Sequence, residues 1–93
     1  HGQPHGAVHG GVVFTLIDTA MGAAATTVLA EGHNCATIDL QIRYHRPVFE
    51  GSLTARAEVV NAGRRIVTLS GEITDGDDRL IATATSAFAV LAG

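Results

Sequence analysis

The stretch HGGVVFTLIDTAMG, residues 9–22, decides how the rest of this 93-residue chain must be arranged. It predicts a long helix over about 10–30, in which Asp18 is the only ionisable residue before Glu31. A helix that is apolar on nearly every face must be covered by other segments, because a surface helix carries a polar stripe. A lone carboxylate there is costly to bury without a partner. We therefore interpret Asp18 as a catalytic candidate.

After the helix the period of apolar residues changes to two, which indicates half-buried strands. We expect the helix to end near residue 31, with Gly32 as the residue that terminates it. The last strand is apolar on both faces toward its end, as a central or interface strand would be. Short turns, including 61–63 and the acidic turn 75–78, favour antiparallel pairing. The predicted strands run over about 36–44, 52–60, 65–74 and 80–91.

These elements predict one α+β domain over residues 1–93, in which a curved antiparallel sheet wraps around a single central helix. A domain this small gains stability from oligomerisation. The formal charge of −3 leaves no basic field for nucleic acid. Cys35 is the single cysteine, which excludes an internal disulfide and fits a reducing cytoplasm. The apolar stretch contains Asp18 and several threonines without flanking lysine or arginine, which argues against a membrane span.

The segment before the helix, residues 1–8, has no periodicity and is expected to be a loop. Gly10 and Gly11 then fall where the first helical turn begins, where backbone N–H groups are unpaired and can receive an anion or a polarised carbonyl. Three histidines spaced by four residues suggest a metal site, but Gly and Pro between them argue against helical stacking. We expect neither a metal nor a cofactor. The histidines are His1, His5 and His9.

The His-Gly-Gly opening with an acid nine residues after the histidine, followed by a strand ending in YHRP, resembles the hotdog-fold acyl-CoA thioesterases. The similarity is greatest to the phenylacetate-degradation and 4-hydroxybenzoyl-CoA thioesterase branch. It extends over HGGVVFTLIDTAMG, ATIDLQIRYHRPV and the series from NAGRRIVTL to the end of the last strand. The resemblance implies the hotdog fold and the hydrolysis of acyl-CoA thioesters to acid and coenzyme A.

The resemblance also assigns roles within the site. The acid matching Asp18 acts as nucleophile or general base, and the N–H matching Gly10 polarises the thioester carbonyl from the helix N-terminus. Gln3 matches a residue that holds the carbonyl or the water, and Thr37 matches one that helps to place the water. We expect His9 to fix the loop by a hydrogen bond, and we count it with Gly11 among the substrate-binding residues.

In this family the site lies between two subunits, which implies a homodimer or a tetramer of two dimers. Relatives normally carry a helix and a strand before the His-Gly-Gly segment, so we expect this chain to lack an N-terminal strand. Relatives of the 4-hydroxybenzoyl type can also carry Thr where this chain has Gly22. Arg46, Arg64 and Arg65 are candidates for the phosphates of coenzyme A, because the guanidinium fork suits phosphate.

Two other functions remain open at this point. One is hydration or dehydration of an acyl thioester on the same fold, although the histidine and acid of that branch are not evident here. The other is a non-catalytic acyl-CoA-binding module in which Asp18 is structural. The sequence does not identify the acyl group.

Overall fold

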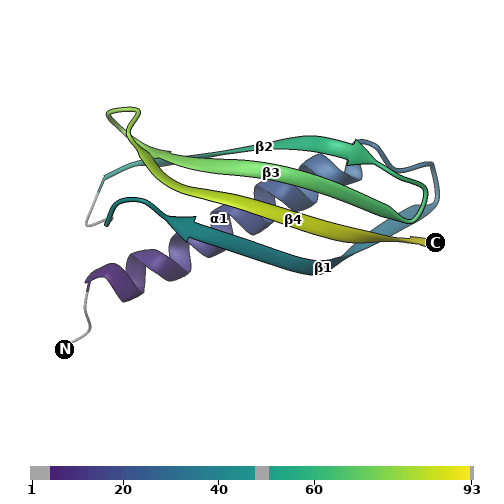
Figure 1. The fold of residues 1–93 in the computed structure, drawn as a ribbon, viewed down its shortest axis with the longest axis horizontal. Coiled ribbons are helices and arrows are strands. Elements are labelled where there is room, and N and C mark those ends of the chain that lie inside the picture. The colour runs from purple at the N-terminus through teal and green to yellow at the C-terminus, as the bar shows by residue number, and fades with distance from the viewer. Residues whose placement is uncertain (1–4, 48–50, 93) are drawn as a thin grey trace.

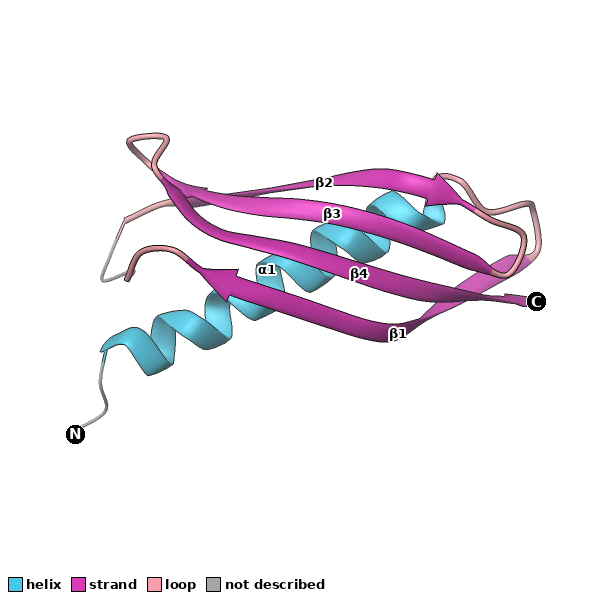
Figure 2. Ribbon diagram, in the orientation of Figure 1, coloured by secondary structure: helices cyan, strands magenta, loops and turns pink. Residues whose placement is uncertain are grey.

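The computed structural model describes residues 5–47 and 51–92, with side chains from residue 11 onward. It confirms the predicted α+β class, with one helix against a curved antiparallel sheet (Figures 1 and 2). The elements are α1 His5–Thr26, β1 His33–Tyr44, β2 Leu53–Ala62, β3 Ile66–Asp75 and β4 Leu80–Ala92.

The strands lie in the order β1-β4-β3-β2, and each neighbouring pair is antiparallel. β4 therefore has a neighbour on each side, which confirms the central position that its apolar content predicted. The hairpin between β2 and β3 is closed by the Gly63 N–H, which donates to the Ile66 carbonyl at 2.9 Å. Since β2 continues through Ala62, the turn falls at residues 63–65 rather than at the predicted 61–63.

The core lies between one stripe of α1 and the inner face of the sheet. From Val13 to Ala25 every fourth residue of the helix is fully buried, and this stripe packs chiefly against β2 and β3. The row of small residues Ala57, Gly71 and Ala84 runs across three strands of that face and lets the helix approach closely. The buried stripe comprises Val13, Ile17, Met21 and Ala25, and the sheet contributes Val67, Leu69, Ile73, Ala82 and Phe88.

The helix begins and ends earlier than the sequence predicted. It starts at His5, so the prediction that residues 1–8 form a loop and that the helix begins near Gly10 is wrong for residues 5–9. Pro4 precedes the first helical residue, and proline is common at helix starts because its missing N–H is not needed there. Two glycines alone do not end a helix whose backbone bonds continue.

The other end of the helix lies at Thr26, not at residue 30. The Thr26 hydroxyl donates to the Gly22 carbonyl at 2.9 Å, and the Thr27 hydroxyl donates to the Ala24 carbonyl at 2.6 Å. Such bonds compete with the helical backbone, and β-branched residues have low helix propensity. Gly32 is therefore not the residue that terminates the helix. Its φ of 83° serves a separate turn, which the His33 N–H closes by donating to the Ala30 carbonyl at 3.1 Å.

A β-bulge divides β1. Thr37 pairs with Phe88 and Asp39 pairs with Ala87, so Ile38 is the extra residue. Paired residues of an antiparallel ladder project from the same face, and Phe88 is buried on the helix side of the sheet. The bulge therefore places Thr37 on the helix side, whereas strict alternation predicted that it faces outward.

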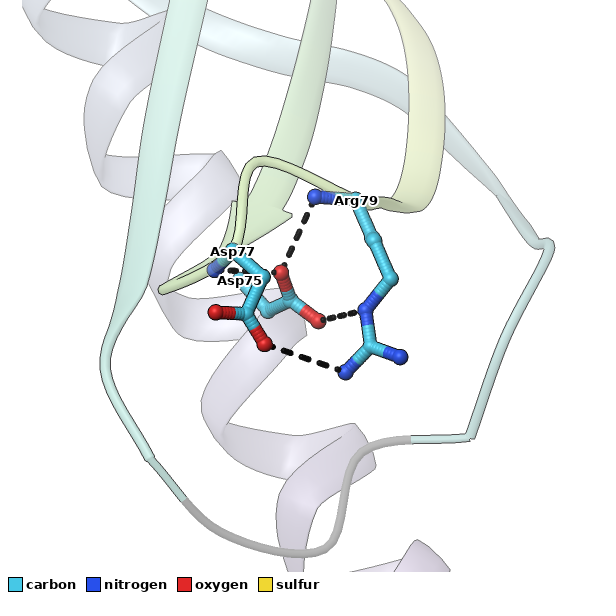
Figure 3. A network of polar contacts seen from close by, with 3 residues as sticks. All are labelled: Asp75, Asp77 and Arg79. Atoms are coloured by element: carbon cyan, nitrogen blue, oxygen red, sulfur yellow. Dashed lines mark hydrogen bonds and ion pairs between the residues drawn. The ribbon is translucent and has the colours of Figure 1, made fainter.

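The acidic turn between β3 and β4 is held by its own side chains (Figure 3). The Asp75 carboxylate accepts the N–H groups of Asp77 and Arg79 and the Nε–H of Arg79, each at 2.9 Å. The hydrogen bond from the Arg79 backbone is the main cause that lowers the pKa of Asp75 below its ordinary value. The Asp75 carboxylate thus stabilises the turn. Asp78 adopts a left-handed φ of 62° in the same turn.

The sheet of a single chain covers only part of α1, whereas the sequence predicted that it would cover nearly every face of the helix. Val12 and Phe14 remain 46% and 49% exposed, and the N-terminal half of α1 projects past the β1 edge of the sheet (Figure 1). Within residues 5–47 and 51–92, no helix is long and apolar enough to cross a membrane. A large apolar helix surface is therefore left uncovered by the described part of the chain.

Candidate active site

Asp18 lies at the middle of α1 and is partly buried. It follows Ile17 of the buried stripe, so it lies on the flank between the side that packs on the sheet and the side that is open. Among the described residues, no hydrogen bond or ion pair reaches its carboxylate. Within the described part of this chain, the Asp18 carboxylate therefore neither accepts a hydrogen bond from a loop nor forms an ion pair with an arginine.

The helix positions one turn before and after Asp18 leave access to it. Phe14, four residues earlier, is half-exposed. Gly22, four residues later, has open space, because a Cβ placed on it meets no atom within 4 Å. Residues four apart lie above one another on a helix, so these two flank the Asp18 carboxylate. The arrangement can accept a substrate group beside the carboxylate without displacing a side chain.

Because the helix starts earlier than predicted, the Gly10 N–H, the predicted oxyanion donor, does not lie at the helix N-terminus. Gly10 is the sixth residue of α1, so its N–H points toward the carbonyl four residues earlier instead of lying free at the first turn. The Gly11 carbonyl accepts the Thr15 hydroxyl at 3.0 Å, and Gly11 has open space around it. Gln3 and the side chain of His9 lie outside the described residues.

Thr37 is exposed, although its strand register puts it on the same side of the sheet as the helix. No hydrogen bond between described residues joins Thr37 to Asp18, so one chain does not bring these two predicted site residues into contact. The bulge that turns Thr37 inward was missed from the sequence. Cys35 and Leu40 both pack on the core although they are five positions apart, so strict alternation would put them on opposite faces, but this is visible only in the packing.

The three predicted phosphate ligands do not form one cluster. Arg64 and Arg65 lie in the β2–β3 hairpin, where the Arg65 carbonyl accepts the Val90 N–H at 2.8 Å. Arg46 follows β1 at the opposite end of the sheet, where its N–H donates to the Ile81 carbonyl at 3.3 Å. Their partners Ile81 and Val90 are nine positions apart on β4, or about 30 Å at the rise of a strand. The hairpin pair and Arg46 therefore cannot contact one phosphate group within a chain.

Comparison with known proteins identifies the family. The model of the thioesterase superfamily matches residues 5–82. The chain belongs to the thioesterase superfamily. It spans about half the length of the curated relatives that it matches, for example 44% and 56% of the first two.

Solved structures of relatives share the fold. The thioesterase HI1161 from Haemophilus influenzae is 32% identical with a TM-score of 0.88, covering 97% of this chain and 63% of that one. The BH2602 protein from Bacillus halodurans, solved with CoA, is 34% identical with a TM-score of 0.85, covering 89% and 55%. A phenylacetic acid degradation-related protein from Ralstonia eutropha is 31% identical with a TM-score of 0.80, covering 86% and 60%. These similarities confirm the resemblance to hotdog thioesterases.

Proposed function

We propose that this chain carries the site of an acyl-CoA thioesterase, which hydrolyses the thioester to free acid and coenzyme A. One observation carries the proposal. The single carboxylate at the middle of the apolar helix is partly buried, lacks a partner among the described residues, and has open space one turn away. Membership of the thioesterase superfamily and the relative solved with CoA support coenzyme A as the carrier.

Asp18 acts on the thioester as general base or as nucleophile. As a base, its carboxylate takes a proton from water while the water oxygen bonds to the carbonyl carbon. The carbon–sulfur bond then breaks, and the sulfur leaves with a proton as the thiol. As a nucleophile, a carboxylate oxygen displaces the thiolate to give an anhydride, which water hydrolyses. Position on the flank of the helix lets the carboxylate meet both water and an apolar acyl group.

Gly10 and Gln3 are proposed to hold the carbonyl oxygen as charge develops on it. A preorganised N–H at that position contributes about 3–4 kcal/mol to the transition state. Because Gly10 lies inside α1, its N–H becomes available only when the first turns of the helix open. The proposal therefore includes a helix that begins near Gly10 when the thioester is bound.

The site is proposed to be completed by a second copy of the chain. β1 lies at the edge of the described sheet, and α1 projects past this edge with Val12 and Phe14 exposed. An unpaired edge strand is a template for pairing, and a two-fold axis perpendicular to the sheet beside β1 joins the two sheets edge to edge, with both helices on the same side. Thr37 then lies at the boundary between subunits, where it helps to place the water. Dimer and tetramer are both compatible with this edge.

The hairpin arginines Arg64 and Arg65 are proposed to bind phosphates of coenzyme A, since both are exposed and form no ion pair with a described carboxylate. Arg46, at the other end of the sheet, contributes to the same coenzyme only from the partner subunit.

Thiol release from a panel of aryl and short, medium and long aliphatic acyl-CoAs tests the function, with Asp18→Asn as the variant. Asn keeps the size of the side chain and removes its charge. We expect turnover on at least one member and a loss of at least a hundredfold in the variant. Glu31→Gln, which removes one exposed carboxylate from the turn between α1 and β1, is the matched control and retains activity. Equal turnover of Asp18→Asn and the native chain contradicts the proposal.

A non-catalytic acyl-CoA-binding module is the second candidate. The observation that favours it is the continuous helix through Gly10, which leaves no free N–H at that residue. This candidate predicts binding of acyl-CoA without thiol release from any member of the panel.

A further inference from the structure

Ser86 is the one polar residue that is buried among the residues that the structure describes. It lies in the central strand β4 and is 5% exposed, and its hydroxyl has no hydrogen-bond partner within the described part of the chain. A buried hydroxyl without a partner has lost its hydrogen bonds to water, which lowers the stability of the folded chain. Most buried polar groups in native proteins are hydrogen-bonded, so this exception calls for an explanation.

Packing accounts for the small size of Ser86 but not for its hydroxyl. Ser86 pairs with Leu40 of β1 and with Leu69 of β3, and Leu69 is buried in the core. Cross-strand partners project from the same face, so Ser86 faces α1. The next residue of β4 on that face is Ala84, which is buried as well. Alanine would meet the same demand for a small side chain at position 86, and the hydroxyl adds a polar group that packing does not require.

A second hydroxyl on the same face belongs to Thr37. Thr37 pairs with Phe88, which is two residues from Ser86 along β4. Residues in this diagonal relationship have Cα atoms about 7–8 Å apart and Cβ atoms somewhat closer. A hydroxyl and a water molecule bond at about 2.8 Å, so one water molecule joins hydroxyl oxygens that are up to about 5.6 Å apart. The register of β1 on β4 therefore allows one water molecule to contact Thr37 and Ser86 together.

Asp18 faces the same side of the layer between helix and sheet. In Figure 1, α1 lies behind the sheet and runs from beyond the β1 edge toward β2. A right-handed helix turns by about 100° per residue, so with Ile17 against Gly71 the next residue, Asp18, turns toward β1. Ser86 lies on that side too, because β4 is between β3 and β1. The carboxylate and the two hydroxyls are thus all on the β1 side of Ile17.

We propose that Ser86 and Thr37 together hold the water molecule that attacks the thioester, while Asp18 takes its proton. This inference rests on the proposed function and adds Ser86 as a second positioning residue. The water donates one hydrogen to Asp18 and the other to the Thr37 oxygen, and it accepts the Ser86 hydroxyl hydrogen. One lone pair of the water is left for the carbonyl carbon. The oxygen–carbon bond forms as the proton passes to Asp18, and cleavage of the carbon–sulfur bond returns that proton to the thiol.

This role also explains why the hydroxyl is present in spite of its effect on stability. Departures from the rules of stable packing are expected where function needs them. A water molecule fixed by a central strand and by the bulge of β1 is oriented before the thioester arrives, which lowers the barrier to attack. Removal of the Ser86 hydroxyl should therefore impair catalysis without impairing the fold.

Ser86→Ala tests the inference through melting curves and steady-state thiol release from the best acyl-CoA of the panel. We expect the melting temperature not to fall, because no bond within the fold is lost. We expect kcat to fall about tenfold, with KM within about twofold of the native value. Ser70→Ala is the matched control, because Ser70 pairs with Thr85 on the face away from the helix, and it should keep the native kcat. A native kcat in Ser86→Ala overturns the inference, and so does a lower melting temperature.

A double variant tests whether the two hydroxyls hold the same water molecule. If they do, Thr37→Val combined with Ser86→Ala lowers kcat by clearly less than the roughly hundredfold product of the single effects, since the first change already releases the water. A loss equal to that product shows independent roles and overturns the shared water. Absence of thiol release by the native chain contradicts the proposed function. An active native chain whose kcat does not depend on Ser86 contradicts this inference alone.

Discussion

Gly71 lies directly beneath Ile17, and a Cβ placed on Gly71 would come within 2.7 Å of Ile17 Cδ1. The same atom would lie 2.9 Å from Met21 Cε and 3.0 Å from the Arg56 carbonyl oxygen. The middle of β3 is thus shaped by the helix that carries Asp18. The position of the candidate catalytic residue therefore depends on the absence of a side chain at Gly71 in β3, which is two strands from β1 in the order β1-β4-β3-β2.

We expect Gly71→Ala to lower the free energy of unfolding by about 1–3 kcal/mol, because the extra methyl forces the helix side chains or the neighbouring backbone to move. Gly22→Ala is the matched control. It adds the same methyl where no atom lies within 4 Å, and should stabilise the helix by up to about 1 kcal/mol. Chemical denaturation of the two variants measures both effects. Equal stability of the two would contradict the close packing of α1 on β3.

Asp75→Asn should lower the melting temperature near neutral pH, since the turn loses an acceptor for the Arg79 side chain and backbone. The pKa of Asp75 is lowered in the folded chain from 3.8. Its stabilisation is therefore fully present above the unfolded pKa and is lost as the pH falls through the lower folded value. Melting curves from pH 6 to about pH 2 should show the difference between variant and native chain shrinking at the acid end.

Asp78→Asn is the control for the charge change at this turn. Asparagine tolerates the left-handed φ of 62° at this position. It should therefore leave the melting temperature nearly unchanged at every pH. A pH dependence as large as that of Asp75→Asn would show that net charge, rather than the bonds of Asp75, stabilises the turn.

The apolar periods in the sequence were sufficient for the order and approximate bounds of the strands, because burial of one face imposes a period of two. They were not sufficient for the bulge at Ile38. Ile38, Leu40 and Ile42 alternate without interruption, and only the pairing with β4 reveals that Ile38 is the extra residue. The role predicted for Thr37 depends on this bulge, and the periodicity of apolar residues in the sequence does not reveal it.

The helix bounds were missed for a different reason. Gly10 and Gly11 are weak helix formers, but a start is decided by the whole first turn, including Pro4 ahead of it. At the other end, the Thr26 and Thr27 hydroxyls bond to backbone carbonyls, which composition alone did not predict. The sequence correctly placed Asp18 within the helix, because the apolar residues around it have the periodicity of a helix. The contacts of Asp18 with a second subunit stay a prediction.

Phe14→Glu should convert the proposed dimer into monomers and abolish thiol release, because a charge on the exposed apolar face of α1 opposes burial against a second copy. Val60→Glu makes a comparable change at a valine that is 67% exposed on β2, the other edge strand of the described sheet. It should leave assembly and activity unchanged. Sedimentation velocity at micromolar concentration measures both variants. A native chain that sediments only as an active monomer would contradict the shared site.

Thr37→Val should lower kcat about tenfold, since the proposed hydroxyl loses one hydrogen bond to the attacking water, worth about 1–1.5 kcal/mol. The substitution keeps the shape of the side chain and suits a strand, so the melting temperature should not fall. Thr85→Val is the matched control, because Thr85 pairs with Ser70 and Gln41 and lies exposed on the face of the sheet away from the helix. Loss of activity in Thr37→Val alone would place the water on the helix side of the bulge. Equal kcat in both variants would instead leave Asp18 to position the water without Thr37.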